Sequence, residues 1–143
     1  MKKIALINGA NLNRLGVREP EIYGHTTLSD VVAQLKAKAS KLNAEIEDFQ
    51  SNSESEIIDH IYALADAGVK FGIINPGAFT HTSVALRDCI AGCGIRFVEV
   101  HISNIYKRED FRHTSLTAPV CDGQISGLGI AGYFAALDYL AAL

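Results

Sequence analysis

The sequence predicts an α/β fold, in which helices cover both faces of a parallel sheet. Apolar runs of strand length alternate with amphipathic helical patterns along the chain, which is typical of right-handed βαβ units. The 143 residues suit a single domain over 1–143, and no repeat or low-complexity linker indicates a second one. Apolar residues make up 48% and charged residues 20%, the balance of a protein with one packed core.

The first predicted strand is Lys3–Asn8, a short apolar run that ends in asparagine. A helix is predicted over Leu28–Leu42, because apolar residues recur there at helical spacing and lysines lie on the other face. Thr27 or Ser29 is its predicted N-cap. The second strand, Glu45–Gln50, alternates between polar and apolar residues, as a half-exposed strand does.

The next helix begins after Ser53, which we expect to form a capping box with Glu56. It is predicted to continue to about Ala67 and to end at Gly68. The third strand, Lys70–Asn75, again ends in asparagine. This middle part of the chain therefore repeats the strand–helix alternation of the first part.

The second half continues with a helix over Ser83–Cys93 and a strand over Arg96–Val100. A weaker fifth strand is predicted over Val120–Ile125, and a terminal helix over Gly132–Leu143. Five strands in a chain of this length favour a flavodoxin-like three-layer sandwich with a five-stranded parallel sheet. Ligands of such sheets bind at the carboxyl ends of the strands, so the residues that follow each strand are the candidates for chemistry.

Composition excludes several classes of partner. The net charge of −3 gives no global basic field, so we expect no nucleic acid partner. No apolar stretch approaches the ~20 residues that cross a bilayer, and the N-terminal apolar run is too short for a signal peptide. Cys89, Cys93 and Cys121 cannot all pair, and free buried thiols are typical of a reducing compartment. We therefore expect a cytoplasmic protein without membrane association.

Residues 8–25, NGANLNRLGVREPEIYGH, form a long connection with no periodicity. Connections of this length are uncommon in compact domains and are usually functional. This one carries Arg14, Arg18, Tyr23 and His25, together with three glycines that can act as hinges. We expect it to complete an active site at the end of the first strand.

Two later segments bring further polar groups to the same edge. NPGAFTHTS, after the third strand, presents Asn75 and His81 near a helix N-terminus, where backbone amides favour an anion. EVHISN ends the fourth strand with Glu99 and His101 on one face, and Arg112 follows. Singly, such residues are usually packed aromatics, satisfied histidines or solvated arginines. Their convergence on one sheet edge predicts an active site.

Motifs for metals and cofactors are missing from the sequence. There is no HExxH, no histidine pair at zinc-site spacing, no GxSxG and no GxxxxGK[ST], so we expect neither metal nor cofactor. Gly127, Gly129 and Gly132 match GxGxxG formally, but a dinucleotide site needs an acidic residue about twenty positions later. The sequence runs only eleven residues beyond Gly132, so we expect close packing of the last helix instead.

This inventory suits proton transfer at a carbon next to a carbonyl. Tyrosine is a poor base at neutral pH because its ordinary pKa is about 10, but a nearby cation stabilises the phenolate. Arg18, five residues before Tyr23, supplies that charge if the loop folds back. His101 can protonate a departing hydroxyl, while Asn75 and Arg112 hold a carboxylate. The sequence therefore predicts elimination of water from a hydroxylated keto acid.

Three segments, NGANLNRLGVREPEIYG, INPGAFTHTSVALRD and VEVHISNIYKREDFRHTS, resemble the signature segments of the type II 3-dehydroquinate dehydratases. The similarity runs nearly from end to end. It implies dehydration of 3-dehydroquinate to 3-dehydroshikimate, the third step of the shikimate pathway, by anti elimination through an enolate and without a cofactor. It also implies a homododecamer, a tetramer of trimers. Whether the cell uses the reaction for biosynthesis or for quinate breakdown is left open.

The resemblance also implies roles for individual residues. Tyr23 resembles the proton acceptor, Arg18 the group that stabilises its anion and the transition state, and His101 the proton donor. Glu99 is expected to position His101, and Asn11 to hold a water or oxygen in the enolate pocket. The remaining matches are substrate-binding positions: Asn75, His81, Ile102, Ser103, Arg112 and, from a neighbouring subunit, Asp88.

Two positions differ from the usual pattern of the family, and a third resembles a supporting position. Ala10 stands where the family usually has proline, so the start of the loop is expected to be more mobile and Asn11 less well oriented. Arg14 stands where the family often has an apolar residue, and Arg108 resembles a structural or supporting position. We expect activity, with a change in substrate affinity at most.

Two alternatives compete with the enzyme. A non-catalytic flavodoxin-like module is one, but a receiver domain needs acidic residues where this chain has Asn8, and a flavin binder would purify yellow. The other is an inactive paralogue or assembly protein that keeps the fold. Intact Arg18, Tyr23 and His101 argue against it.

Overall fold

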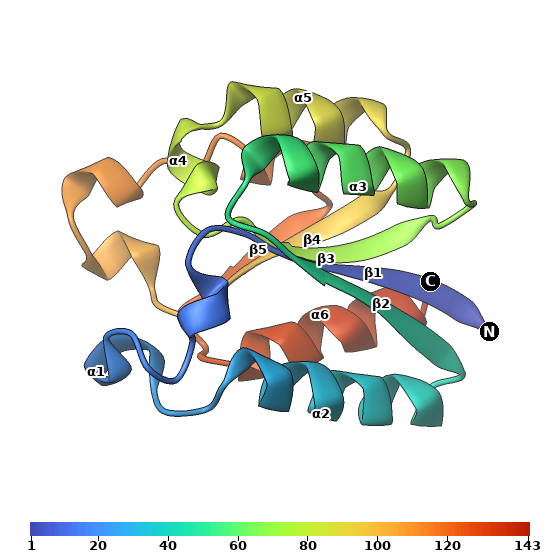
Figure 1. Ribbon diagram of the computed structural model, residues 1–143, viewed down its shortest axis with the longest axis horizontal. Helices are drawn as coiled ribbons and strands as arrows, with labels where there is room; N and C mark the ends of the chain where they lie inside the picture. The colour runs from blue at the N-terminus through green and yellow to red at the C-terminus, as the bar shows by residue number, and fades with distance from the viewer.

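The computed structural model describes all 143 residues and centres on one sheet of five parallel strands in the order β2-β1-β3-β4-β5 (Figure 1). The strands are β1 Lys2–Asn8, β2 Ala44–Gln50, β3 Phe71–Asn75, β4 Arg96–His101 and β5 Gly123–Ser126. The predicted five-stranded parallel sheet is therefore confirmed. The last strand begins later than predicted because Ala118–Val120, which contains Pro119, forms a 3-10 turn.

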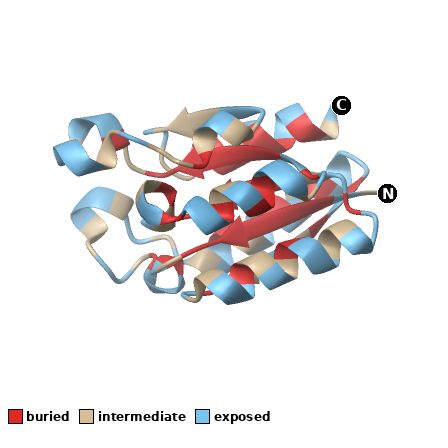
Figure 2. Cartoon of the chain, turned by 90° about the horizontal axis from the view of Figure 1, so that it is seen from above, coloured by how far each residue is buried: buried red, intermediate tan, exposed pale blue.

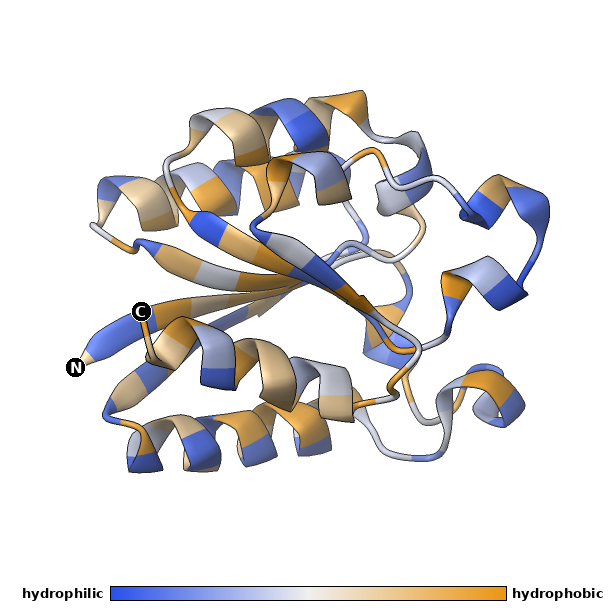
Figure 3. Cartoon of the chain, turned by 180° about the vertical axis from the view of Figure 1, so that it is seen from behind, coloured by the Kyte–Doolittle hydropathy of each residue, from blue (hydrophilic) through white to orange (hydrophobic).

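Helices cover both faces of the sheet, as Figure 1 shows. On one face lie α2 Leu28–Lys41 and α6 Ala131–Ala141, and on the other lie α3 Glu54–Asp66 and α5 Val84–Gly92. A separate apolar core fills each interlayer space. Buried residues are concentrated on the strands and on the inner faces of the helices (Figure 2), and the outer helix faces are more hydrophilic (Figure 3). This is the predicted flavodoxin-like three-layer sandwich.

The helix caps agree with the sequence at α2 and differ from it at α3. Thr27 accepts from the Asp30 amide while the Asp30 carboxylate accepts from the Thr27 amide, a complete capping box. Ser53 accepts from the Glu56 amide as predicted. The Glu56 carboxylate accepts from the Ser51 hydroxyl at 2.6 Å instead of from Ser53. The return bond of the predicted capping box, from the Ser53 amide to the Glu56 carboxylate, is therefore wrong, because the Ser53 amide donates to Ser51 Oγ.

The glycine-rich segment before α6 packs as expected. Gly127 and Gly129 have φ values of 91° and 61°, which suit a turn. A Cβ on Gly132 would lie 3.2 Å from Val100 Cγ1, tighter than an ordinary contact. The close approach of α6 to the sheet is thus the reason for this glycine. No helix combines the length and apolarity needed to span a membrane.

The connections that matter for function gather at the carboxyl ends of the strands, at the left of Figure 1. The segment after β1 contains a 3-10 turn, Leu12–Arg14, and the short helix α1, Pro20–Tyr23. Helix α4, Phe79–Thr82, follows β3, and three 3-10 turns follow β4: Ile105–Lys107, Asp110–Arg112 and Ala118–Val120. Strands β1 and β3 are neighbours but lead to opposite sides of the sheet, and ligands bind at such switch points.

Candidate active site

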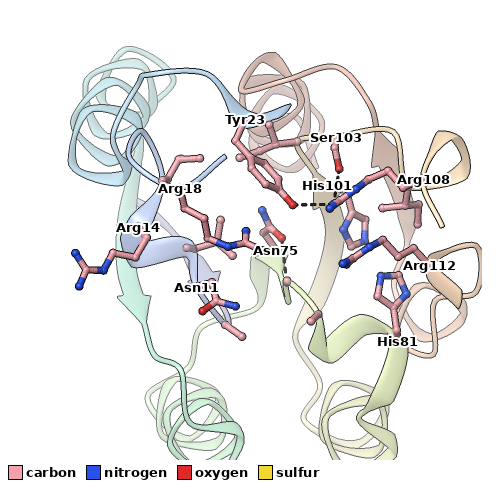
Figure 4. A pocket seen from close by; sticks show the side chains of 17 residues that line it. Asn11, Arg14, Arg18, Tyr23, Asn75, His81, His101, Ser103, Arg108 and Arg112 are labelled. Carbon is pink, nitrogen blue, oxygen red and sulfur yellow. Dashed lines mark hydrogen bonds between the residues drawn. The ribbon is translucent and has the colours of Figure 1, made fainter. Parts of the chain in front are cut away.

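A cavity of about 230 Å³ opens at this switch point. Its walls come from the connection after β1, from the segment that runs from β3 into α4, and from the end of β4 with the turns that follow it. Figure 4 shows most of its polar side chains pointing toward a common space. Those labelled there are Asn11, Arg14, Arg18, Tyr23, Asn75, His81, His101, Ser103, Arg108 and Arg112.

Most of the residues selected from the sequence lie together. The cavity lining includes nine of them: Asn11, Arg18, Tyr23, Asn75, His81, His101, Ile102, Ser103 and Arg112. Glu99 lies behind His101 and is fully buried. Asp88 is exposed on α5 and is not part of the lining. The chain therefore builds one site from three separate segments, with Asp88 outside it.

Tyr23 is held by an arginine that the sequence did not single out for this contact. Arg108 Nη1 donates to the Tyr23 hydroxyl oxygen at 2.7 Å and to Ser103 Oγ at 3.3 Å. The guanidinium carbon of Arg18 lies 5.5 Å from the centre of the Tyr23 ring, and Arg18 pairs with Glu19 at 3.3 Å. Two guanidinium groups therefore flank the ring, and the one that reaches its oxygen is Arg108. Their charges stabilise negative charge on that oxygen.

His101 contacts an anionic partner, whereas Tyr23 contacts a cationic one. Its Nε2 lies 2.8 Å from a carboxylate oxygen of Glu99. The two residues alternate onto one face of β4, as predicted. Burial would raise the pKa of the Glu99 carboxyl, but the hydrogen bond and charge of His101 and further hydrogen bonds outweigh burial and hold that pKa at about 2. An ionised carboxylate only accepts, so Nε2 carries a proton and Nδ1 is left for the cavity.

The carboxylate of Glu99 is enclosed by donors that sequence reasoning missed. Thr80 and Ser115 lie 3.1 and 2.8 Å from it, Gln124 Nε2 lies at 2.9 Å, and Thr117 also donates to it. Thr80 and Thr117 are fully buried. A carboxylate in the interior requires such partners. Three hydroxyl residues within four positions, Thr114, Ser115 and Thr117, are the one sequence signal that points to this enclosure.

The segment of residues 114–117 also orients His81. Its Nδ1 lies 2.8 Å from the carbonyl oxygen of Thr114, which can only accept, so Nδ1 carries the proton. Burial lowers the pKa of His81, although the bond to Thr114 opposes the shift. A neutral imidazole with its proton on Nδ1 presents Nε2 as an acceptor, which suits a ligand hydroxyl.

The start of the loop after β1 is tied to a neighbouring connection. Asn11 has φ 70°, and its amide donates to Asn52 Oδ1 at 2.8 Å. Gln50 Nε2 donates to the Gly9 carbonyl at 3.2 Å. Hydrogen bonds therefore hold the backbone on both sides of Ala10. The greater mobility expected from Ala10 stays a prediction.

No group of three or more histidine, cysteine, aspartate or glutamate side chains is arranged to hold a metal ion. All three cysteines are free thiols. Burial raises the pKa of the Cys89 thiol to about 11, which keeps it protonated and unreactive at neutral pH. The chemistry available in the cavity is thus that of a phenol, two imidazoles, amides and guanidinium groups.

A family model described as dehydroquinase class II matches residues 2–141. The chain belongs to the class II dehydroquinase family. It is 53% identical over 137 residues to a 3-dehydroquinate dehydratase of Nitrosomonas eutropha, covering 96% of this chain and 94% of the relative. It is 55% identical over 140 residues to catabolic 3-dehydroquinase 1 of Aspergillus fumigatus, covering 98% and 93%.

Solved structures of class II dehydroquinases agree with this chain in fold. The type II dehydroquinase of Butyrivibrio crossotus superposes with a TM-score of 0.95 at 48% identity, covering 97% of both chains. That of Propionibacterium acnes gives a TM-score of 0.96 at 41% identity, covering 100% of this chain and 98% of the other. This chain therefore shares its fold with these dehydroquinases over nearly its whole length.

Proposed function

We propose that this protein dehydrates 3-dehydroquinate to 3-dehydroshikimate, the third step of the shikimate pathway, by anti elimination through an enolate. The observation that carries the mechanism is the opposite charge of the groups that contact Tyr23 and His101, two titratable side chains of the cavity. The Arg108 guanidinium donates a hydrogen bond to the Tyr23 hydroxyl oxygen, and the Glu99 carboxylate is hydrogen-bonded to Nε2 of His101. A cation favours the phenolate and an anion favours the imidazolium, so Tyr23 is the base and His101 the acid.

Each atom of the reaction has an assigned destination. Tyr23 takes a proton from the carbon next to the ketone, and the electrons of that bond form the enolate. When the enolate collapses, the carbon–oxygen bond on the neighbouring carbon breaks, and the leaving hydroxyl takes the Nδ1 proton of His101 and departs as water. One proton has then moved onto Tyr23 and one has left His101, so the two must exchange a proton through solvent before the next turnover.

Substrate binding is assigned to the rest of the lining. Arg112 and the amides of Ile102 and Ser103 hold the substrate carboxylate, because a guanidinium and converging N–H groups suit a planar anion. Asn75 and His81 bind the substrate hydroxyls. Asn11 holds a water or oxygen where the enolate charge develops.

Arg18 is assigned to the stabilisation of the transition state. In the structure its guanidinium lies against the Tyr23 ring and pairs with Glu19. A small displacement of the loop toward His101 would bring this charge to the developing enolate. Loop closure is therefore part of the proposed cycle, and no cofactor takes part.

The working assembly is proposed to be a homododecamer, a tetramer of trimers, in the cytoplasm. Asp88 is exposed on α5 and away from the cavity of its own subunit, which supports its assignment to the site of a neighbour. Light scattering after gel filtration measures the mass directly. A monomer would remove Asp88 from the site.

The deciding experiment mixes purified protein with 3-dehydroquinate and follows the ultraviolet absorbance of the conjugated enone product. We expect a rise in absorbance that is linear in enzyme concentration without added metal or cofactor. No rise at any neutral pH would exclude the proposed activity. A yellow preparation would favour the flavin-binding alternative instead.

A further inference from the structure

A buried row of three polar side chains lies behind the cavity. Asn8 and Asn75 end the neighbouring strands β1 and β3, where they are register partners, and Tyr133 reaches them from the first turn of α6. The Tyr133 hydroxyl oxygen lies 2.8 Å from Asn75 Nδ2 and 2.6 Å from Asn8 Oδ1. Tyr133 is fully buried, and among the three only Asn75 lines the cavity.

One backbone amide fixes the direction of every hydrogen bond in this row. The N–H of Gly77 can only donate, and it lies 3.1 Å from Asn75 Oδ1. Asn75 must therefore turn its Nδ2 toward Tyr133. Because that amide nitrogen only donates, the Tyr133 oxygen accepts, and the single phenolic proton goes to Asn8 Oδ1.

Burial raises the pKa of the Tyr133 hydroxyl well above its ordinary value, so the phenol keeps this proton at any physiological pH. The row is thus a fixed relay of donors and acceptors, from Gly77 through Asn75 and Tyr133 to Asn8. Reversing any one bond would place two donors or two acceptors face to face in the interior, which is unfavourable.

The relay leaves one proton of Asn75 for a ligand. Asn75 Nδ2 carries two protons, of which Tyr133 takes one and no other protein group takes the second. Figure 4 shows Asn75 at the centre of the cavity, near Tyr23 and Arg18. A rotated amide would instead present its oxygen there and would repel the oxygens of an anionic ligand.

We propose that Tyr133 is a positioning residue of the active site, whose hydroxyl locks Asn75 as a hydrogen-bond donor toward an oxygen of the substrate. The proposal rests on the function proposed above and adds a residue from α6 to it. Tyr133 does not line the cavity and acts only through Asn75. Removing its hydroxyl leaves Asn75 Nδ2 and Asn8 Oδ1 without their partners. The N–H of Gly77 then holds the Asn75 side chain alone, and the direction of Nδ2 toward the ligand is less firmly fixed.

The test is Tyr133→Phe, assayed for kcat and KM with 3-dehydroquinate. Because Asn75 would bind an oxygen present in both substrate and transition state, KM should rise about tenfold while kcat stays within about threefold. Tyr139→Phe is the matched control. Tyr139 lies on the same helix, is 45% exposed and contacts Asp122 at 3.0 Å instead of the cavity. An unchanged KM in Tyr133→Phe, or an equal rise in both variants, would overturn the proposal.

A double-mutant cycle separates positioning from packing. In an Asn75→Ala background, Tyr133→Phe should change KM by less than about twofold, since its only route to the ligand is gone. Additive effects would contradict the proposal. Should Tyr133→Phe not fold, Asn8→Ala removes the acceptor of the Tyr133 proton and should raise KM about threefold; an unaltered KM there also contradicts the proposal. An inactive wild-type protein would instead exclude the proposed function, so the two failures are distinguishable.

Discussion

The Tyr23 side of the cavity comes from one connection after β1, whereas the His101 side comes from a buried strand end enclosed by other segments. Arg18 and Glu19 have side chains that are 40% exposed, and no residue of α1 is buried, although Tyr23 packs partly against the core. Glu99 is fully buried, and it accepts hydrogen bonds from residues of α4, β5 and the segment between 115 and 117.

This contrast separates two ways of making a side chain reactive. The acid side is fixed in advance, because His101 and its carboxylate are held by the folded core. The base side depends on Arg18, which is 40% exposed, and on the half-buried Arg108, and both lie in connections that can rearrange without unfolding the sheet. Changes on the Tyr23 side should therefore reduce activity alone, and changes on the His101 side should reduce activity and stability together.

The largest effect is expected from Tyr23→Phe. Loss of the phenolic oxygen removes the base, and kcat should fall by at least about 10³-fold, within the range of acid–base contributions. The free energy of unfolding should change by no more than about 1 kcal/mol, since a single hydrogen bond to Arg108 is lost. Tyr62→Phe, at an exposed tyrosine on α3, is the control. Turnover near normal in Tyr23→Phe would remove Tyr23 from the base role.

Arg18→Ala should come second, with kcat reduced about 10²-fold, the usual loss when one donor to a developing anion is removed. Its melting temperature should be unchanged, because an exposed guanidinium contributes little packing. Arg14→Ala is the matched control: Figure 4 shows that the Arg14 guanidinium points away from Tyr23. If the two alanine variants lose activity equally, the loop acts through general charge and Arg18 has no special role.

Glu99→Gln tests the His101 side, where we expect kcat to fall by about 30-fold because only part of the acid contribution is lost. Stability should fall as well. The pKa of Glu99 is held at about 2, below its ordinary 4.5, so the folded protein resists this protonation more than the unfolded chain does. The stability that Glu99 contributes is complete above pH 4.5 and is lost as the pH falls towards 2.

Urea unfolding at several pH values measures this contribution. Between pH 4.5 and 2 the wild type should lose stability more steeply than Glu99→Gln, because the variant has no such proton to bind. At neutral pH the variant should be less stable by about 3 kcal/mol. Parallel pH curves for the two proteins would show that Glu99 is not held as an anion by the fold.

The sequence predicts local features of the site well and distant ones poorly. The sheet follows from strand-length apolar runs, and the pairing of Glu99 with His101 follows from their i, i+2 spacing on a strand. The contact between Tyr23 and Arg108 joins residues 85 positions apart. No pattern indicates which of several arginines reaches the phenol, and Arg18 was the expected one because it is nearest in sequence.

The same limit applies to the donors around Glu99 and to the relay through Tyr133. The sequence alone gives Thr80 no special role, and it indicates that Tyr133 is a core aromatic at helical spacing. Their hydroxyls acquire a role only when the fold brings a strand end beside them. Buried polar partners of this kind are chosen by tertiary packing, so a single sequence carries little sign of them.

The smallest effect is expected from Ala10→Pro, which replaces this chain's alanine with the residue more usual in the family. The Ala10 amide makes no backbone hydrogen bond, and Ala10 is not among the residues with positive φ, so proline removes no partner and meets no left-handed backbone. By restricting the unfolded chain, it should stabilise the protein by about 0.5 kcal/mol.

If Ala10 loosens the start of the loop, proline should also orient Asn11 better and lower KM, by less than about threefold. Melting temperature and KM of the two proteins test both expectations. A stabilised variant with unaltered KM would mean that the bonds from Gln50 and Asn52 already fix this end of the loop. The adjustable part of the Tyr23 side would then lie further along, between Arg18 and Tyr23.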